Sequence, residues 1–182
     1  MSEELLVRCC APTLASIKTG NMFTCRYEST QEMTESIRSL NRRLRQKGLR
    51  IIPLRFRQGV GLIYVYRPCR LQRDLNSEHA LRLLKECGYH CGNVTCCLQQ
   101  LRMKLEENED FPHEIGLFLG YPPEDVDGFM HRKAEAKLAG HWKVYGDVHA
   151  AERIFSLYKK CTKVYLNQWS KGSSIERLTV AA

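Results

Sequence analysis

The segment from Ser29 to Arg67 limits the possible folds more than any other part of the chain, because the period of its apolar residues changes along it. Ser29 and Glu32 form a capping box, which marks the start of a helix. Apolar residues then recur at helical spacing before Gly48, a residue type that commonly ends helices: Met33, Ile37, Leu40 and Leu44. We therefore expect an amphipathic helix that buries one face.

After Gly48 the pattern becomes that of strands. Residues 51–57 and 62–67 are rich in β-branched and aromatic residues and flank a glycine-containing turn at 59–61, which predicts a β-hairpin. In this hairpin we expect Ile52, Leu54 and Phe56 to face the core. A helix beside a hairpin indicates the α+β class, in which helices pack on a small sheet.

The remaining elements are predicted from start and stop signals. Pro12 suits the first turn of a helix that Gly20 ends. Further helices are expected from Asn76 or Ser77 to Cys87, from Asn93 to Leu105, and after Pro123 and Asp147. Short strands are expected near 114–120 and 142–145. The sequence thus predicts a small, mainly antiparallel sheet packed with about five to six helices.

Length and composition favour one cytoplasmic domain. The chain has 182 residues, of which 43% are hydrophobic, and this is enough for one sizeable core. We expect a single compact domain over residues 1–172 and a flexible tail over 173–182. The sequence has no apolar run long enough for a membrane span, and it opens with acidic residues rather than an export signal. The odd count of nine cysteines then favours reduced thiols over disulfides.

The net charge of +8 is concentrated in one segment. Residues 38–57 contain eight Lys or Arg residues and no acid. We expect a surface for an anionic partner here, formed by Arg42, Arg43, Arg45, Arg55 and Arg57. The alternative is a solvated face of a helix and a strand, with no partner.

Cys10 is the strongest candidate for a reactive thiolate. It directly precedes the helix predicted to begin at Pro12, where unpaired N–H groups and the helix dipole would lower its pKa. Lys18 follows one to two turns later. The alternative is that Cys10 is an inert, partly buried thiol.

A second group of cysteines surrounds His90. Cys87, His90 and Cys91 lie in the expected turn between two helices and are weak candidates for metal ligands. Their spacing lacks the two paired knuckles of structural zinc sites, so burial of small apolar thiols is the alternative.

His113 and Glu114 are candidates for acid–base catalysis, or for a haem or metal ligand, on a loop that Pro112 makes rigid. On an extended chain, neighbouring residues point in opposite directions and would not act together. The sequence contains no Gly-rich phosphate loop, no serine nucleophile motif and no pair of CxxC motifs. Whether the protein is an enzyme therefore stays open.

Four motifs together resemble a known family. They are the segment 10–18 (CAPTLASIK), the hairpin, the segment 111–126 (FPHEIGLFLGYPPEDV) and the segment 142–146 (WKVYG). The chain resembles an uncharacterised domain-of-unknown-function family of roughly this length, found mainly in anaerobic Gram-positive bacteria. Recurring positions of that family correspond here to Cys10, Pro12, Thr13, Lys18, Pro112, His113, Glu114, Gly120, Tyr121, Trp142, Lys143, Tyr145 and Cys161.

The resemblance implies a link to redox or iron physiology, through genes for flavodoxins and iron transport found near those of the family. Our first hypothesis is an accessory protein that binds a small anionic ligand or a cofactor such as a flavin, haem or iron. The ligand would contact Thr13, Lys18, Tyr121, Trp142, Lys143 and Tyr145.

Three alternatives remain open. A thiol enzyme would centre on Cys10. A nucleic-acid-binding module would use the basic segment, with Tyr64 and Tyr66 as stacking residues. An adaptor would dock an acidic protein, such as a flavodoxin, on that same basic segment. We expect no membrane association.

Overall fold

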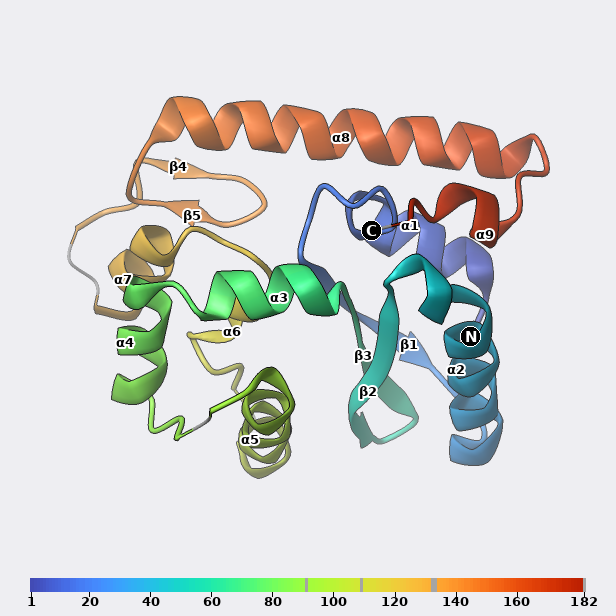
Figure 1. Cartoon of the computed structure of the whole chain (residues 1–182), viewed down its shortest axis with the longest axis horizontal. Helices are drawn as coiled ribbons and strands as arrows, with labels where there is room; N and C mark the ends of the chain where they lie inside the picture. The colour runs from blue at the N-terminus through green and yellow to red at the C-terminus, as the bar shows by residue number, and fades with distance from the viewer. Residues whose placement is uncertain (91, 109, 132–133, 182) are drawn as a thin grey trace. The chain divides into compact units, whose positions relative to one another are not determined.

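The computed structural model describes residues 1–90, 92–108, 110–131 and 134–181 (Figure 1). Within this part the chain forms nine α-helices, more than the five to six expected, together with one 3₁₀-helix and two small antiparallel sheets. The α+β class is therefore confirmed. The elements are α1 (Glu3–Leu14), β1 (Gly20–Arg26), α2 (Thr30–Leu44), η1 (Arg45–Lys47), β2 (Arg50–Arg57), β3 (Val60–Tyr66), α3 (Pro68–Leu75), α4 (Glu78–Glu86), α5 (Val94–Glu107), α6 (Ile115–Phe118), α7 (Pro123–His131), β4 (Leu138–Ala139), β5 (Lys143–Val144), α8 (Val148–Ser170) and α9 (Ile175–Leu178).

The chain divides into two compact units. Unit 1 comprises Met1–Arg70 together with the chain from Lys160 onward, and unit 2 comprises Leu71–Lys159. The boundaries fall within α3 and α8. The prediction of one domain over residues 1–172 stays a prediction.

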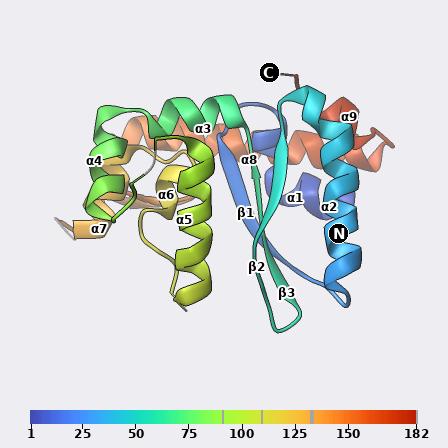
Figure 2. The same ribbon diagram turned by 60° about the horizontal axis from the view of Figure 1, so that its bottom comes forward.

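Unit 1 contains a three-stranded antiparallel sheet in the order β1–β3–β2 (Figure 2). The hairpin predicted over residues 51–67 is confirmed as β2 and β3, whereas β1 was not predicted. Side chains alternate between faces along a strand, so Phe23, Ile51, Ile63 and Val65 share one face. These residues belong to the core of unit 1.

The predicted core face of β2 is partly wrong. Leu54 is only 1% exposed and Phe56 packs against the core of unit 1, as expected, whereas Ile52 lies opposite Tyr64 on the other face of the sheet. The cause is an irregularity in the pairing with β3 between Pro53 and Arg55, which shifts the register by one residue. A strict alternation cannot anticipate such a shift.

Helices α1 and α2 pack on the sheet face that forms the core. The predicted stripe of α2 is confirmed, because Met33, Ile37, Leu40 and Leu44 are all buried. Ser29 caps this helix by accepting a hydrogen bond from the backbone N–H of Glu32.

A side-chain amide attaches α2 to the edge of β2. Asn41 donates from Nδ2 to the carbonyl of Ile51 at 2.7 Å and accepts from the N–H of Ile51 at 2.9 Å. These two hydrogen bonds take the place of those that a neighbouring strand would make with the backbone of Ile51.

The first helix begins earlier than expected. Ser2 caps α1 by accepting from the N–H of Leu5, and the helix runs through Cys10 and Pro12 to Leu14. The prediction that a helix starts at Pro12 and ends at Gly20 is wrong, because Pro12 lies in the last turn of α1 and Gly20 begins β1.

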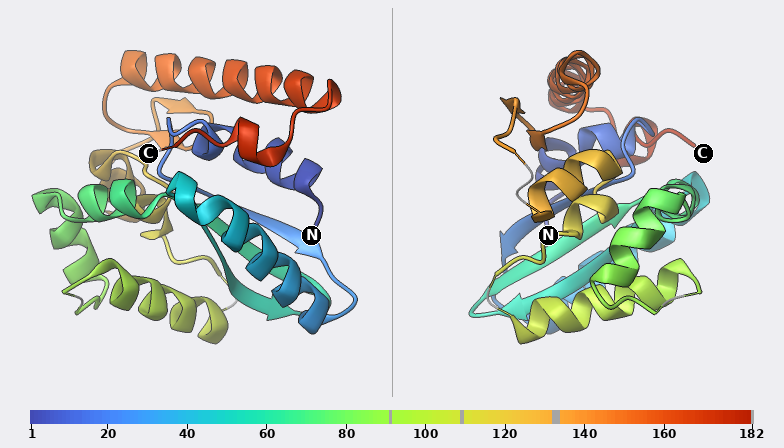
Figure 3. Two further views of the ribbon diagram at one scale, coloured as in Figure 1. Left: turned by 45° about the vertical axis from the view of Figure 1, so that its right-hand side comes forward. Right: turned by 90° about the vertical axis from the view of Figure 1, so that its left-hand side faces the viewer.

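The segment expected to be a flexible tail contains a short helix. α9 lies beside α1 (Figure 3) and buries Ile175 and Leu178 in the core of unit 1. Its neighbour Thr179 is also buried and donates from its hydroxyl to the carbonyl of Ile175. α9 and Thr179 are therefore packed against the rest of unit 1.

In unit 2, α4 and α7 lie against each other around a buried carboxylate. Asp127 on α7 lies 3.2 Å from Nε2 of His79 on α4 and 2.6 Å from Nδ1 of His131. Arg82 adds an ion-pair contact at 3.7 Å. Side chains of both helices thus converge on the Asp127 carboxylate.

The two strands expected in this region have different outcomes. The prediction of a strand near 114–120 is wrong, since Ile115–Phe118 form α6. The strand near 142–145 is confirmed as β5, which pairs with β4 in a sheet of its own. None of the described helices is both long enough and apolar enough to cross a membrane.

Candidate ligand-binding pocket

Unit 2 contains a cavity of about 240 Å³ between α6, α7 and β5. Its residues come from two stretches of the chain, 113–129 and 142–143, and all of them except Phe129 lie in motifs of the family resemblance. It is lined by His113, Ile115, Gly116, Tyr121, Asp125, Val126, Phe129, Trp142 and Lys143. Four residues named from the sequence, His113, Tyr121, Trp142 and Lys143, are thus brought together.

The pocket wall is built from stacked aromatic rings. Tyr121 and Trp142 lie with their centroids 4.9 Å apart and their planes inclined by 28°. Phe155 of α8 packs edge-on against Trp142 at 4.6 Å, which fixes the indole from the other side. Burial raises the pKa of the Tyr121 phenol, so this side chain stays neutral and serves as an apolar surface.

Asp125 holds the β5 segment against α7. Its side chain is buried, and it accepts three hydrogen bonds of 2.7 Å each, from the indole N–H of Trp142 and the backbone N–H groups of Tyr145 and Gly146. Because the carboxylate has these three donors, its role is to position Trp142 rather than to contact a ligand. Tyr145 therefore contributes through its backbone, and its ring lies against Gly128.

Two glycines allow the close approach of these segments. A Cβ atom at Gly128 would lie 2.5 Å from Cγ of Tyr145, and one at Gly116 would lie 2.8 Å from Cγ2 of Val126. Neither distance is compatible with a side chain, so the pocket depends on glycine at both positions.

His113 and Lys143 converge on the same ring at the mouth of the pocket. The imidazole of His113 packs edge-on against Phe129 with centroids 4.9 Å apart. The ammonium of Lys143 lies 5.2 Å from the centroid of that same ring. Both side chains are exposed, so the apolar interior ends in a mouth with a histidine and a lysine.

Glu114 does not act together with His113. It is buried, and Oε1 accepts a hydrogen bond of 2.8 Å from Lys104 of α5, whose ammonium also donates to the carbonyl of Cys87. Burial, with the nearby Glu114 carboxylate, raises the pKa of the Cys87 thiol to about 11. Glu114 therefore belongs to a structural ion pair.

The proposed metal ligands are not assembled in the described part of the chain. Cys91 lies outside the described residues, and among those described no group of three or more His, Cys, Asp or Glu side chains could hold a metal ion. Cys87 makes the contacts given above, and the backbone N–H of His90 donates to Gln100.

Three further candidates, Cys10, Thr13 and Lys18, belong to unit 1 and are not among the residues that line the pocket. Cys10 is fully buried in the interior of α1, and burial raises the pKa of its thiol well above the ordinary value. The expectation of a thiolate at a helix start is therefore wrong. Thr13 donates from its hydroxyl to Oδ1 of Asn21.

Lys18 is the most perturbed amine of unit 1. It is 5% exposed, and burial lowers its pKa from 10.5 to about 8, although the neighbouring Cys10 acts in the opposite direction. Between these two pKa values the unfolded chain binds more protons than the folded chain at this position. The contribution of Lys18 to stability therefore rises with pH across this window.

From pH 7 to pH 9.5, we expect the unfolding free energy of the natural protein to rise by about 2 kcal/mol relative to that of Lys18→Met. Urea unfolding at a series of pH values measures it. Lys163→Met, at an exposed position of unit 1, serves as control and should show a constant difference. If the difference between the natural protein and Lys18→Met were also the same at every pH, the lowered pKa of Lys18 would be contradicted.

Two important pocket residues were missed by sequence analysis. Asp125 lies in the motif at 111–126 and Phe129 in the helix expected after Pro123, but neither was named as a candidate. Both lie four residues apart on α7 and thus on one face, which is the signal that could have paired them. Their partners Trp142, Tyr145 and Lys143 are distant in sequence, so the contacts themselves leave no local pattern.

These observations define an α+β protein with a small apolar pocket whose mouth carries a histidine and a lysine. The chain belongs to the family described as "Protein of unknown function (DUF3793)", which matches residues 6–179. This confirms the resemblance to an uncharacterised family. The comparisons with curated proteins and with solved structures found no match.

Proposed function

We propose that the protein binds a small, largely apolar molecule with one anionic group in the pocket of unit 2. The observation that supports this most directly is the convergence of His113 and Lys143 on the ring of Phe129. An anionic group at the mouth could contact both side chains while the apolar part of the ligand lies on Trp142 and Tyr121.

The size of the pocket narrows the ligand class. Sites for drug-sized ligands occupy about 300–1,000 Å³, whereas this cavity measures about 240 Å³. We therefore favour a compact molecule, such as an aromatic carboxylate, over an enclosed flavin or haem. A redox or iron role, as the family resemblance implies, would then act through such a ligand.

The expected result is that benzoate binds in the pocket more tightly than benzamide, its neutral analogue, because only benzoate can pair with Lys143. Amide NMR spectra titrated with each compound measure the affinity. They also locate the site through Gly116, Val126 and the indole N–H of Trp142. Lys143→Met should weaken benzoate binding roughly five- to tenfold, in line with one partly exposed ion pair.

Lys159→Met is the matched control, since it removes the same charge from an exposed position on α8. It should leave the affinity for benzoate unchanged. Equal binding of benzoate and benzamide, or shifts confined to residues outside the pocket, would contradict the proposal.

A further inference from the structure

The charges of the chain are divided unequally between its two units. Unit 1 has 17 Lys and Arg against 6 Asp and Glu, a formal net charge of +11. Unit 2 has 11 Lys and Arg against 14 Asp and Glu, a net charge of −3. The basic character of the protein therefore belongs entirely to unit 1, whereas the pocket lies in unit 2.

Three arginines form a row along the outer face of α2 and the first residue of the 3₁₀-helix η1 that follows it. Arg38, Arg42 and Arg45 follow one another at intervals of four and three residues and are all exposed. Side chains at this spacing lie along one face of a helix, and here they lie opposite the buried stripe. Within the described part of the chain none of the three takes part in an ion pair.

The other basic residues of the segment 38–57 do not belong to this row. Arg43 is bound to Glu3 and Glu176, which attaches α2 to α1 and α9. Arg50 donates to the backbone carbonyls of Arg45 and Leu49.

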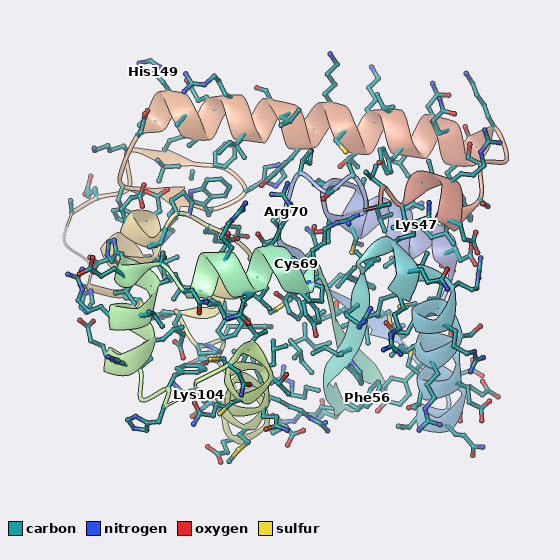
Figure 4. The ribbon with its side chains drawn as sticks, in the orientation of Figure 1. Lys47, Phe56, Cys69, Arg70, Lys104 and His149 are labelled. Carbon is teal, nitrogen blue, oxygen red and sulfur yellow. The ribbon has the colours of Figure 1, made fainter. Side chains whose placement is uncertain are left out.

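The remaining basic residues, Lys47, Arg55 and Arg57, lie toward different ends of β2. Figure 4 shows Lys47 in the turn after α2 and Phe56 toward the other end of β2. Arg55 and Arg57 flank Phe56 in sequence and thus lie at that far end. The five arginines predicted as one surface are therefore not one patch, and of these five only Arg42 and Arg45 belong to the row that Arg38 begins.

We propose that this row binds the phosphate backbone of a nucleic acid without reading its sequence. The exposed face of α2 has no apolar side chain beside the row. A protein partner would therefore have only surface ion pairs, each of which contributes about 0–1 kcal/mol, and no apolar anchor. A nucleic acid releases condensed counterions when basic side chains contact its phosphates. Basic side chains alone are therefore sufficient to bind it.

The aromatic residues of unit 1 exclude base stacking as the main contact. Tyr64 is fully buried and stacks on Tyr66 with centroids 4.8 Å apart. In the described part of unit 1 the other aromatic side chains are buried or half-buried. Stacking on single-stranded bases needs exposed rings, so the row contacts phosphates and is indifferent to sequence.

Fluorescence anisotropy with a labelled DNA duplex of about 20 base pairs, at salt concentrations from about 50 to 200 mM, tests this. The natural protein should bind at the lowest salt and lose affinity steeply as salt is added. The variant with Arg38→Gln, Arg42→Gln and Arg45→Gln should bind more weakly. Its plot of log K against log salt should be less steep by roughly 2–3 units, as expected for three lost phosphate contacts.

The control variant carries Arg153→Gln, Lys159→Gln and Lys163→Gln, which remove the same charge from exposed positions of α8. It should retain the natural salt slope. Equal slopes for the two triple variants, or no binding at the lowest salt, would overturn the proposal. Competition by poly-L-glutamate as strong as by unlabelled duplex would overturn it in favour of an acidic protein partner.

Discussion

Replacing Arg67 by methionine is expected to lower the free energy of unfolding by about 4 kcal/mol. The guanidinium is 1% exposed and donates to four backbone carbonyls, those of Thr13, Leu14, Lys47 and Val180. Two of these carbonyls lie at the end of α1, where the helix dipole favours a cation. Methionine would remove all four of these bonds and leave the carbonyls of Thr13 and Leu14 with the backbone N–H groups of Ser16 and Val180 as donors. Denaturant unfolding measures the loss.

Two further variants test the geometry of this site. Arg67→Lys should recover only part of the stability, because an ammonium cannot reach carbonyls that a planar guanidinium contacts from different sides. Arg177→Met, at an exposed position on α9, should change stability by less than about 0.5 kcal/mol. The segment around Val180 should also become sensitive to proteases in Arg67→Met. If Arg67→Met were as stable as the natural protein, the four hydrogen bonds of Arg67 would contribute little to stability.

Replacing Asp125 by asparagine is expected to destabilise unit 2 by about 3 kcal/mol, because hydrogen bonds to a charged acceptor contribute about 1.5–3 kcal/mol each. An amide has one acceptor oxygen, so its NH₂ group must face either the indole N–H of Trp142 or the backbone donors of Tyr145 and Gly146. Thermal unfolding followed by tryptophan fluorescence measures the effect.

Loss of the Asp125 contacts should also affect the pocket. Trp142 would no longer be held against Tyr121, so the affinity for benzoate should fall together with the stability. Trp142→Phe removes the indole donor together with part of the ring that packs on Tyr121 and Phe155, and should cost about 2 kcal/mol. Glu124→Gln, at the exposed neighbouring position, is the control and should leave both properties unchanged. If Asp125→Asn had the natural melting temperature, the contacts of Asp125 would not hold β5 in place.

The elements that could be predicted from the sequence are those with several agreeing local signals. α2 has a capping box, a stripe at helical spacing and a terminal glycine, and the structure contains all three. The β2–β3 hairpin likewise combines alternation with a glycine-containing turn. Each feature depends on residues close in sequence, so no tertiary contact is needed to recognise it.

Elements with conflicting signals were predicted wrongly. Pro12 was interpreted as a helix start, although Leu6, Cys10 and Leu14 are already at helical spacing before and after it. Proline lacks an N–H group, but α1 tolerates it in the last turn, where Pro12 accepts from the N–H groups of Ile17 and Lys18. Tertiary burial outweighed the local preference.

The segment around α6 shows a different limit. Gly116, Leu117 and Phe118 are buried in succession, which gives neither a helical nor a strand period. A short apolar run between prolines fits both structures, so length and periodicity could not decide.

Only part of the candidate site was predicted from the sequence. His113, Tyr121, Trp142 and Lys143 came from motifs of the family resemblance, and the structure places all four in one pocket. The same reasoning added Lys18, which belongs to unit 1. Residues that recur in a family are selected for folding as well as for binding, and the sequence alone does not separate the two roles.

The contact between Asn41 and Ile51 has a consequence for how copies of the protein meet in a crowded solution. An open strand edge offers unpaired N–H and C=O groups to any extended chain nearby, and such edges are common starting points for aggregation. On β2 the amide of Asn41 occupies both groups of Ile51, Pro53 has no N–H to offer, and the irregularity after it breaks the repeat. A neighbouring molecule therefore has no regular ladder to join at this edge, and the sheet cannot be extended there into a fibril.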